Sequence, residues 1–277
     1  MNEKLVSVVI ITHNRSRLLQ KAIESVLNQT YNNIELIIVD DYSTDNTQEI
    51  VSQLIQNNPN IKYIRLEKQS GANAARNRGI QEAQGYFITG LDDDDTMTNN
   101  RIIELVNKYN DTFAYVCSEV FYISKKSKSR KRFKYFNDII TLEDMLYQNC
   151  SGNQILTTKQ MFLDAGLYDE TLISAQDYDM WLKLLLLKPQ AKLVKTPLMN
   201  VDRDDAVQRI SSSKRKQKGY FNLYKKYKKY MNNDQKRFQL FKLYLGRGKK
   251  ITLKHFFIFI SRKQFIMYLY LVLKSKR

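Results

Sequence analysis

Residues 86–95 read Tyr86-Phe-Ile-Thr-Gly-Leu-Asp-Asp-Asp-Asp95, a short apolar run that ends in four consecutive aspartates. A β-branched and aromatic run of this length predicts a buried strand. In an open α/β sheet, ligands bind beyond the carboxyl ends of the strands. Four adjacent carboxylates repel one another, and a divalent cation that carries a diphosphate would compensate their charge. The alternative interpretation is a solvated acidic loop before the next helix.

The sequence before this run alternates apolar strands with helices. The expected strands are Leu5–Thr12, Ile34–Val39 and Ile61–Leu66, and the expected helices are Ser16–Gln29, Thr44–Asn57 and Gly71–Gln84, the last capped by Ser70. Fully apolar strands separated by helices indicate a mostly parallel sheet that is covered on both faces. The loops after these strands should therefore meet at the edge that carries the four aspartates.

The middle of the chain is less regular. Thr112–Ser124 predicts a further strand, and residues 125–134 predict a basic loop. Three more helices are expected, at Leu142–Asn149, Thr158–Ala165 and Ser174–Lys188. These patterns predict one α/β domain over residues 1–210, with a first half at 1–110 and a second at 111–210.

The net charge of +17 belongs to the C-terminal part of the chain. Residues 211–277 hold 20 Lys/Arg and one acid, Asp234, whereas residues 1–210 hold 25 Lys/Arg and 27 Asp/Glu. Lysines and aromatic residues interleave there, which predicts a basic, mainly helical extension. We favour a helical segment on an anionic membrane surface. Nucleic-acid binding and a helical subdomain with a solvated lysine face are the alternatives, and no nucleic-acid partner is expected.

Targeting signals are not evident. The apolar segment Leu5–Thr12 follows Met1–Lys4 directly and is too short for a signal peptide. The stretch Leu253–Leu273 contains three cationic residues, so it lacks the roughly 20 apolar residues of a spanning helix. Cys117 and Cys150 fit no metal-binding spacing. We therefore expect a cytoplasmic protein.

Two further segments carry groups that suit a nucleotide. The carboxylate of Asp41 could accept a hydrogen bond from a uracil imide or a ribose hydroxyl, or Asp41 or Ser43 could cap the next helix. The segment Gly71-Ala-Asn-Ala-Ala-Arg-Asn-Arg-Gly79 combines small residues with two arginines suited to phosphate. Arg76 and Arg78 lie two positions apart on the expected helix, so only one should reach a site.

Four segments in series resemble the family 2 glycosyltransferases. They are Val6-Ser-Val-Val-Ile-Ile-Thr-His-Asn-Arg15, Ile38-Val-Asp-Asp41, Gly71–Gly79 and Leu91-Asp-Asp-Asp-Asp95. Members of this family are inverting enzymes of the GT-A fold that use nucleotide-activated sugars. The resemblance is strong over residues 5–110, looser over 111–210 and absent beyond Gly219. It implies a GT-A type, Rossmann-like sheet, with the nucleotide sugar bound by residues 1–110 and the acceptor by 111–210.

The resemblance also implies roles for residues that bind the nucleotide sugar. Thr12 and Arg15 would line the nucleotide pocket, and Asp41 would bond the base. Arg76 would face the diphosphate. The nucleotide is expected to be UDP.

The family's aspartate motif usually runs Asp-x-Asp-Asp. By this resemblance Asp92 would serve the ribose side, and Asp94 would bind the metal ion, Mn²⁺ or Mg²⁺. Asp93 stands at the variable position, where many relatives carry a small residue. We group Asp93 with the nucleotide-sugar residues and leave open whether it touches the metal or the sugar.

The catalytic base of the family lies in an acidic pair before an aromatic-rich helix, which Ala175-Gln-Asp-Tyr-Asp-Met-Trp-Leu182 resembles. Asp177 would take the proton from the attacking acceptor hydroxyl, although it could instead only cap the helix. Gln176 replaces the common Glu and would bond the acceptor or donor sugar. Asp179 is expected to be solvated or capping. Trp181 is either a platform for the acceptor sugar or a core residue.

Two weaker assignments complete the predicted site. Asn153, in Gly152-Asn-Gln-Ile155, resembles the family's acceptor-side loop, and Arg209 could close over the diphosphate. The resemblance implies a metal-dependent, inverting transfer of a hexose or N-acetylhexosamine to a glycan or lipid-linked acceptor. Bacterial surface polysaccharide assembly at the inner face of the cell membrane is the expected setting. The alternative is a non-catalytic protein that binds nucleotide sugars or nucleic acid.

Overall fold

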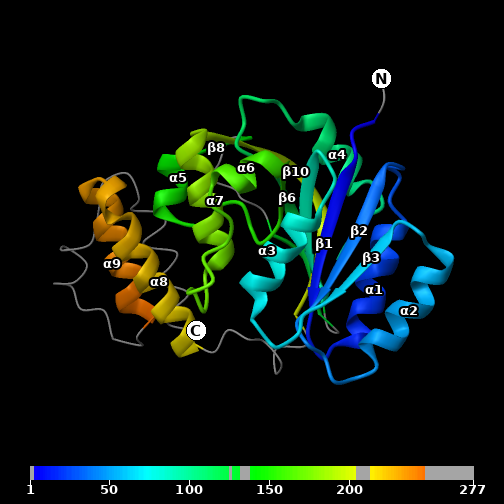
Figure 1. Ribbon diagram of the computed structural model, residues 1–277. Coiled ribbons are helices and arrows are strands. Elements are labelled where there is room, and N and C mark those ends of the chain that lie inside the picture. The colour runs from blue at the N-terminus through cyan, green and yellow to red at the C-terminus, as the bar shows by residue number, and fades with distance from the viewer. Residues whose placement is uncertain (1–2, 125–126, 132–137, 204–212, 247–277) are drawn as a thin grey trace.

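The computed structural model describes residues 3–124, 127–131, 138–203 and 213–246. Its described strands form one sheet with the order β3-β2-β1-β4-β9-β6-β10-β5, to which β7 and β8 add at β6 and β10 (Figure 1). The strands are β1 (Val6–Thr12), β2 (Ile34–Asp40), β3 (Ile61–Arg65), β4 (Phe87–Asp92), β5 (Asp95–Met97), β6 (Val116–Ser124), β7 (Ser127–Lys131), β8 (Ile139–Thr141), β9 (Ile155–Thr158) and β10 (Gln190–Asp202). The helices are α1 (Ser16–Leu27), α2 (Thr47–Asn57), α3 (Ala72–Glu82), α4 (Arg101–Lys108), α5 (Leu142–Tyr147), α6 (Lys159–Asp164), α7 (Gln176–Leu187), α8 (Ser213–Tyr227) and α9 (Asn233–Gly246).

The first half of the sheet is parallel, as the apolar strand pattern predicts. Strands β3, β2, β1 and β4 pair in parallel in that order. The chain moves outward from β1 to β3 and then returns to place β4 on the other side of β1. Such a reversal of strand order opens a crevice at the carboxyl ends of the two central strands. The register pairs Ile11 of β1 with Asp92 of β4, so the aspartates lie at this crevice.

Both faces of the parallel strands are buried. Val8 and Ile10 of β1 pack in one apolar cluster with α1, and Val9 packs in a second cluster with α3. Gly79 allows α3 to lie close to the sheet, since a Cβ there would be 2.4 Å from Val9 Cγ1. The prediction of a sheet covered on both faces is therefore confirmed.

The second half of the sheet contains strands that the sequence pattern did not predict. Strand β10 is 13 residues long and runs parallel to β6, with register shifts around Pro197. The lysines and the proline of β10 interrupt its apolar run, so the strand cannot be recognised from the sequence pattern. Residues 127–131 form β7, an antiparallel partner of β6, so the prediction of a loop over 125–134 is wrong there. Pairing with an existing strand, rather than apolar burial, holds this cationic segment in the sheet.

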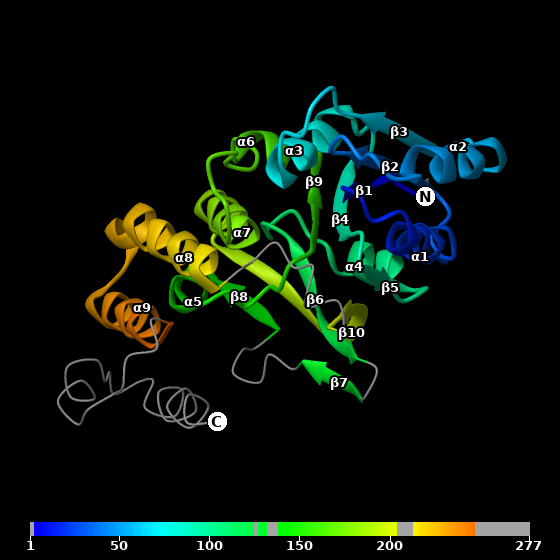
Figure 2. The ribbon, with the colours of Figure 1, turned by 90° about the horizontal axis from the view of Figure 1, so that it is seen from below.

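The C-terminal helices α8 and α9 pack beside α5 and α7 (Figures 1 and 2). Tyr227, Phe238 and Phe241 are buried in this packing, whereas Lys225 and Lys228 are exposed. Residues 213–246 therefore match the alternative of a helical subdomain with a solvated lysine face. The stretch Leu253–Leu273 lies outside the described residues. Among the helices that the structure describes, none is long and apolar enough to cross a membrane.

Candidate active site

Three of the four consecutive aspartates converge at the carboxyl end of β4. Carboxylate oxygens of Asp92, Asp94 and Asp95 all lie within 4.8 Å of one another. Clustered carboxylate oxygens are the ligands that Mg²⁺ and Mn²⁺ prefer. The residues present therefore fit a divalent metal ion. The sequence predicted Asp94 alone as the ligand, and Asp95 was overlooked although it closes the Asp-x-Asp-Asp pattern.

Asp93 is not part of this group and contacts residues at the end of β1 and the start of α1. Its carboxylate accepts hydrogen bonds from Thr12 Oγ1 at 2.8 Å and from Arg15 Nη1 at 3.0 Å. Arg15 also reaches Asp94 at 3.3 Å. Burial raises the pKa of Asp93 to about 6, although the charge of Arg15 opposes the shift. Asp93 thus anchors Thr12 and Arg15 at the crevice and lies outside the three-carboxylate group.

Two neighbouring amides support the aspartates from the loop before β9. Asn153 Nδ2 donates to Asp92 at 3.0 Å and to Asp95 at 3.1 Å. Gln154 Nε2 donates to Asp92 at 3.1 Å, and Gly90 leaves room for it, because a Cβ there would lie 2.2 Å from Gln154 Oε1. Asn153, predicted as an acceptor contact, therefore also orients the carboxylates. Gln154 was missed, although it is the next residue of the same motif.

A pocket opens beside the aspartates. Its lining includes Asp94, Asp95, Lys21, Asn200 and Asp202. Asp95 is 3% exposed, and the backbone N–H of Asp202 donates to its carboxylate at 3.1 Å. Burial, with the nearby charges of Asp92 and Asp94, raises the pKa of Asp95. A cation in this group would stabilise all three carboxylates in their charged form.

Of the two arginines in α3, only one reaches the site. Arg76 Nη2 lies 3.0 Å from Asp92 Oδ1, and its guanidinium carbon is 5.5 Å from the centre of the Tyr168 ring. Burial lowers the pKa of Arg76, but the charges of Asp177 and Asp92 outweigh this effect and raise it above the usual value. Arg78 is half exposed and pairs with Glu82 at 2.9 Å. The prediction that one of the two is a surface residue is confirmed.

Asp41 holds the start of α3. Its carboxylate accepts the backbone N–H of Ser70 at 2.6 Å and of Gly71 at 2.9 Å. Helix α3 begins at Ala72 with Gly71 at the N-cap and no side-chain cap, so the prediction that Ser70 caps it is wrong. Asp41, and not the side chain of Ser70, supplies hydrogen-bond acceptors at the start of the helix, for the backbone N–H groups of Ser70 and Gly71. A contact between Asp41 and a nucleotide base stays a prediction.

Asp177 lies in the first turn of α7. Its Oδ1 is shielded from solvent and has no hydrogen-bond partner among the described residues. Burial raises the pKa of Asp177 to about 6; Arg76 opposes this shift and Asp92 adds to it. Asp177 is thus coupled electrostatically to both Arg76 and Asp92. A buried acceptor without a partner suits a ligand hydroxyl, and Gln176 lies half-buried beside it.

Trp181 belongs to the core. Its side chain is 1% exposed, and its indole N–H donates to the carbonyl oxygen of Gly152 at 3.1 Å. The ring also packs against Tyr115 and Tyr168. Trp181 therefore fixes the loop that carries Asn153, and the interpretation as an acceptor platform is corrected because no ring face is exposed. Arg209 lies outside the described residues.

Comparison with known proteins agrees with this geometry. Residues 7–166 match the family described as "Glycosyl transferase family 2". One relative, WcaA of Escherichia coli (strain K12), is named for a glycosyl transferase of colanic acid biosynthesis and is 36% identical over 271 residues, 91% of each chain. The chain belongs to glycosyl transferase family 2 and is a glycosyltransferase.

Other relatives and solved structures extend the comparison. The GalNAc(5)-diNAcBac-PP-undecaprenol beta-1,3-glucosyltransferase of Campylobacter jejuni is 31% identical over 64% of this chain and 59% of its own. S. aureus TarS 1-349 in complex with UDP-GlcNAc superposes with a TM-score of 0.69 at 17% identity, over 98% of this chain and 79% of that one. Mannosyltransferase PcManGT from Pyrobaculum calidifontis, in complex with GDP-Man and Mn²⁺, superposes with a TM-score of 0.62 at 15% sequence identity. The match covers 88% of this chain and 70% of that one. These likenesses show that the fold is of the GT-A type.

Proposed function

We propose that the protein is a metal-dependent, inverting glycosyltransferase that moves a hexose or N-acetylhexosamine from a UDP-sugar to a glycan or lipid-linked saccharide. The observation that carries this proposal is the presence of two kinds of carboxylate site, both of which lie near Arg76. Asp92, Asp94 and Asp95 form a carboxylate group at the end of β4. Asp177 has a buried oxygen, Oδ1, with no hydrogen-bond partner among the described residues, and the charges of Arg76 and Asp92 act on it. Donor activation and acceptor deprotonation need these two kinds of site.

The donor side of the proposed mechanism rests on β1, β4 and α3. A divalent ion held by Asp94 with Asp92 and Asp95 would neutralise charge on the leaving diphosphate. Arg15 and Arg76 already face these carboxylates and are placed to approach phosphate oxygens. Thr12 and Asp41 would then line the pocket for ribose and base. TarS with UDP-GlcNAc and PcManGT with GDP-Man and Mn²⁺ support a nucleotide sugar and a metal ion in this fold.

The acceptor side rests on the first turn of α7. Asp177 would accept the proton of the attacking hydroxyl while that oxygen forms the bond to C1 of the sugar, and the C1–O bond to the diphosphate breaks. A single displacement of this kind inverts the anomeric configuration. Arg76 would keep Asp177 ionised before attack, because a nearby cation favours the carboxylate. Gln176 would orient the acceptor or donor sugar.

We further propose that the protein works in bacterial surface polysaccharide assembly, as a peripheral protein at the inner face of the cell membrane. The names of the E. coli and C. jejuni relatives refer to colanic acid and to an undecaprenol-linked acceptor. Exposed lysines on α8 and the following turn, among them Lys225, Lys228 and Lys229, would attract anionic lipid. Replacing these three by Gln should reduce flotation of the full chain with anionic vesicles; equal flotation would contradict a role for them.

The test of the proposed reaction is a panel of UDP-glucose, UDP-galactose and their N-acetylated amines, with Mn²⁺, with Mg²⁺ and with EDTA. Undecaprenyl-diphosphate-linked saccharides serve as acceptors. We expect metal-dependent release of UDP from one donor and transfer of its sugar. The product's anomeric configuration, read by NMR, should be opposite to the donor's. Absence of turnover by folded protein across the panel would favour a non-catalytic binding protein.

A further inference from the structure

The proposed base lies two residues from a second aspartate, Asp179, which the sequence analysis expected to be solvated or to cap the helix. That expectation is wrong: Asp179 is 1% exposed. A carboxylate this deeply buried is retained only with cationic and hydrogen-bonding partners. Two of its partners, Lys226 and Tyr227, come from α8, outside the segment that matches the family.

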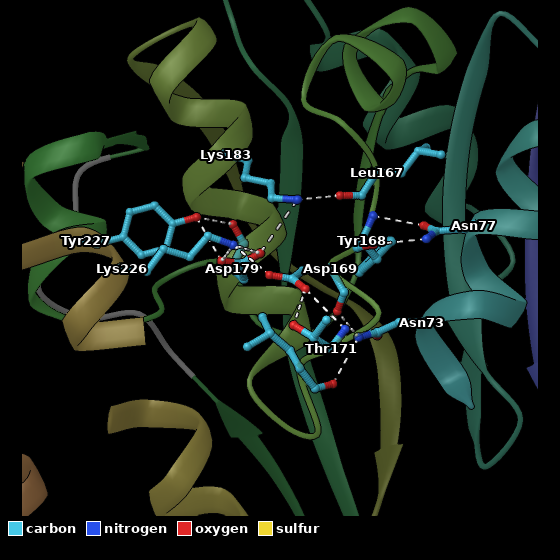
Figure 3. Close-up of polar contacts among 11 residues, drawn as sticks. Asn73, Asn77, Leu167, Tyr168, Asp169, Thr171, Asp179, Lys183, Lys226 and Tyr227 are labelled. Carbon is cyan, nitrogen blue, oxygen red and sulfur yellow. Dashed lines mark hydrogen bonds and ion pairs between the residues drawn. The ribbon is translucent and has the colours of Figure 1, made fainter. Parts of the chain in front are cut away.

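Lys226 and Tyr227 of α8 close over Asp179. Lys226 Nζ lies 2.8 Å from Asp179 Oδ1, and the hydroxyl of Tyr227 donates to the same oxygen at 2.9 Å. Lys183, one turn further along α7, lies 3.8 Å from Oδ2. The three side chains point at the carboxylate from two helices (Figure 3). The first turn of α7 is thereby tied to α8.

The same lysine also holds the loop that leads into α7. Lys226 Nζ lies 3.0 Å from Asp169 Oδ2. From the other side, Asn73 of α3 donates to the carbonyl oxygens of Asp169 and Leu172 at 2.7 and 3.1 Å (Figure 3). Asn73 lies one turn before Arg76, the residue that contacts Asp92. The loop therefore connects α3, which carries Arg76, with α8.

The junction between this loop and α7 needs such support. Ala175, the N-cap of α7, has a φ of +62°, a left-handed conformation that is unfavourable for a residue with a Cβ. Helix α8 packs directly on the preceding residue, because a Cβ on Gly219 would lie 2.6 Å from the carbonyl oxygen of Ser174. Asp177 follows Ala175 by two residues, so small changes at this junction would move its carboxylate.

We propose that Lys226 and Tyr227 are positioning residues for the base Asp177. By neutralising and orienting Asp179 they fix the first turn of α7 and the left-handed junction before it. Helix α8 would then contribute to catalysis by positioning the base. This inference rests on the proposed function, because it presumes that Asp177 is the base.

The test compares full-length wild type, Lys226→Met, Lys226→Arg and Tyr227→Phe, with Lys108→Met as the control on an exposed lysine in the last turn of α4. The assay is turnover of the UDP-sugar that the wild type uses, and UDP binding with Mn²⁺. We expect Lys226→Met to lower kcat about 10-fold, since small misplacements of catalytic groups have effects of this size. UDP affinity and donor KM should change less than about 2-fold, because these residues do not touch the donor side.

The remaining variants complete the test. Lys226→Arg should recover most of the rate, Tyr227→Phe should lose less than Lys226→Met, and Lys108→Met should match the wild type. In an Asp177→Asn background, Lys226→Met should cause no further loss, because the group that it positions is already gone. If Lys226→Met does not fold, Tyr227→Phe, which removes one hydroxyl, decides the question.

Several outcomes would overturn the inference. Full kcat in folded Lys226→Met, or in Tyr227→Phe where only that variant folds, would contradict it. An equal fractional loss with and without Asp177 would contradict it too, because the loss would then be general. A wild-type chain that transfers no sugar would contradict the proposed function itself, and this inference with it.

Discussion

Two carboxylate clusters lie close together in this protein, and they differ in how completely they are neutralised. The donor cluster, Asp92–Asp95, has four carboxylates, and Arg15 and Arg76 are cationic partners of this cluster among the described residues. The helix cluster, Asp169 and Asp179, has two carboxylates that both pair with Lys226, and Asp179 also pairs with Lys183. Among the described residues, carboxylates therefore outnumber their arginine partners in the first cluster, which lies beside a pocket, and equal their lysine partners in number in the second.

This difference separates a binding site from a structural one. Carboxylates that remain uncompensated in the folded protein hold capacity for an external cation. Carboxylates that are buried and paired with lysine hold helices in place. Asp177 is related to both clusters. The charge of Asp92 in the first cluster acts on it, and it lies two residues before Asp179 of the second cluster on α7.

The largest expected effect comes from Asp177→Asn, which keeps the shape of the side chain but removes the proposed base. Turnover should fall roughly 10³-fold, within the range for loss of a general base. UDP binding in the presence of Mn²⁺ should stay within about 2-fold of wild type, because Asp177 is not a member of the donor cluster. Steady-state kinetics and calorimetry measure the two quantities. Loss of UDP binding in this variant would place Asp177 on the donor side instead.

Asp94→Ala attacks the donor cluster directly. Turnover should fall roughly 10²-fold, the scale on which removal of one electrostatic stabiliser slows an enzyme. Asp111→Asn, at an exposed acid outside the cluster, is the control and should leave the rate unchanged. The rates are measured over a series of Mn²⁺ concentrations. If Asp94→Ala reaches the full wild-type rate at the same Mn²⁺ concentration as the wild type, Asp94 is not a metal ligand.

The two arginines of α3 offer a matched pair. Arg76→Gln should lower kcat/KM about 10-fold, because it removes a hydrogen bond to a charged group of the donor cluster. Arg78→Gln removes a surface ion pair with Glu82, which contributes little, and should leave kcat/KM within about 2-fold. Equal effects of the two substitutions would contradict the assignment of Arg76 to the site.

The smallest effect is a pH dependence. Burial raises the pKa of Asp177 to about 6, and the base must be ionised, so the rate should fall as pH decreases through about 6. The charged and titratable groups that act on it are Arg76 and Asp92, with the tyrosines Tyr168 and Tyr220 beside it. Arg76→Gln should move this acid limb to higher pH, because it removes the cation that favours the carboxylate. An acid limb at the same pH in Arg76→Gln and in wild type would show that Arg76 does not affect the pKa of the proposed base.

Much of the fold follows from local pattern, and the exceptions have a physical reason. Strands β1, β2 and β4 are apolar on both faces and can be recognised without a partner. Strand β7 consists of Ser, Lys and Arg and forms only because β6 offers a pairing edge. Strand β10 is interrupted by lysines and Pro197 and is held by pairing with β6 and β5. Such strands depend on distant partners that no local window contains.

The same distinction applies to the site. Asp94, Arg76 and Asp177 could be singled out as candidates because they stand in short motifs with a recognisable order, and their roles stay predictions. The contact between Asn153 and Asp92 spans 61 positions, and the contact between Lys226 and Asp179 spans 47. Neither contact leaves a local signal, so Asp179 could not be distinguished from a solvated acid. The burial of Trp181 likewise depends on packing against Tyr115 and Tyr168.

The most direct test of the contrast between the two clusters is the affinity for Mn²⁺, measured calorimetrically with and without UDP. If the donor cluster is completed by a metal ion that carries the diphosphate, UDP should tighten Mn²⁺ binding, and Asp94→Ala should abolish that tightening. The same Mn²⁺ affinity with and without UDP would contradict a metal ion that carries the diphosphate at the donor cluster. An undiminished effect of UDP on Mn²⁺ affinity in Asp94→Ala would contradict it too.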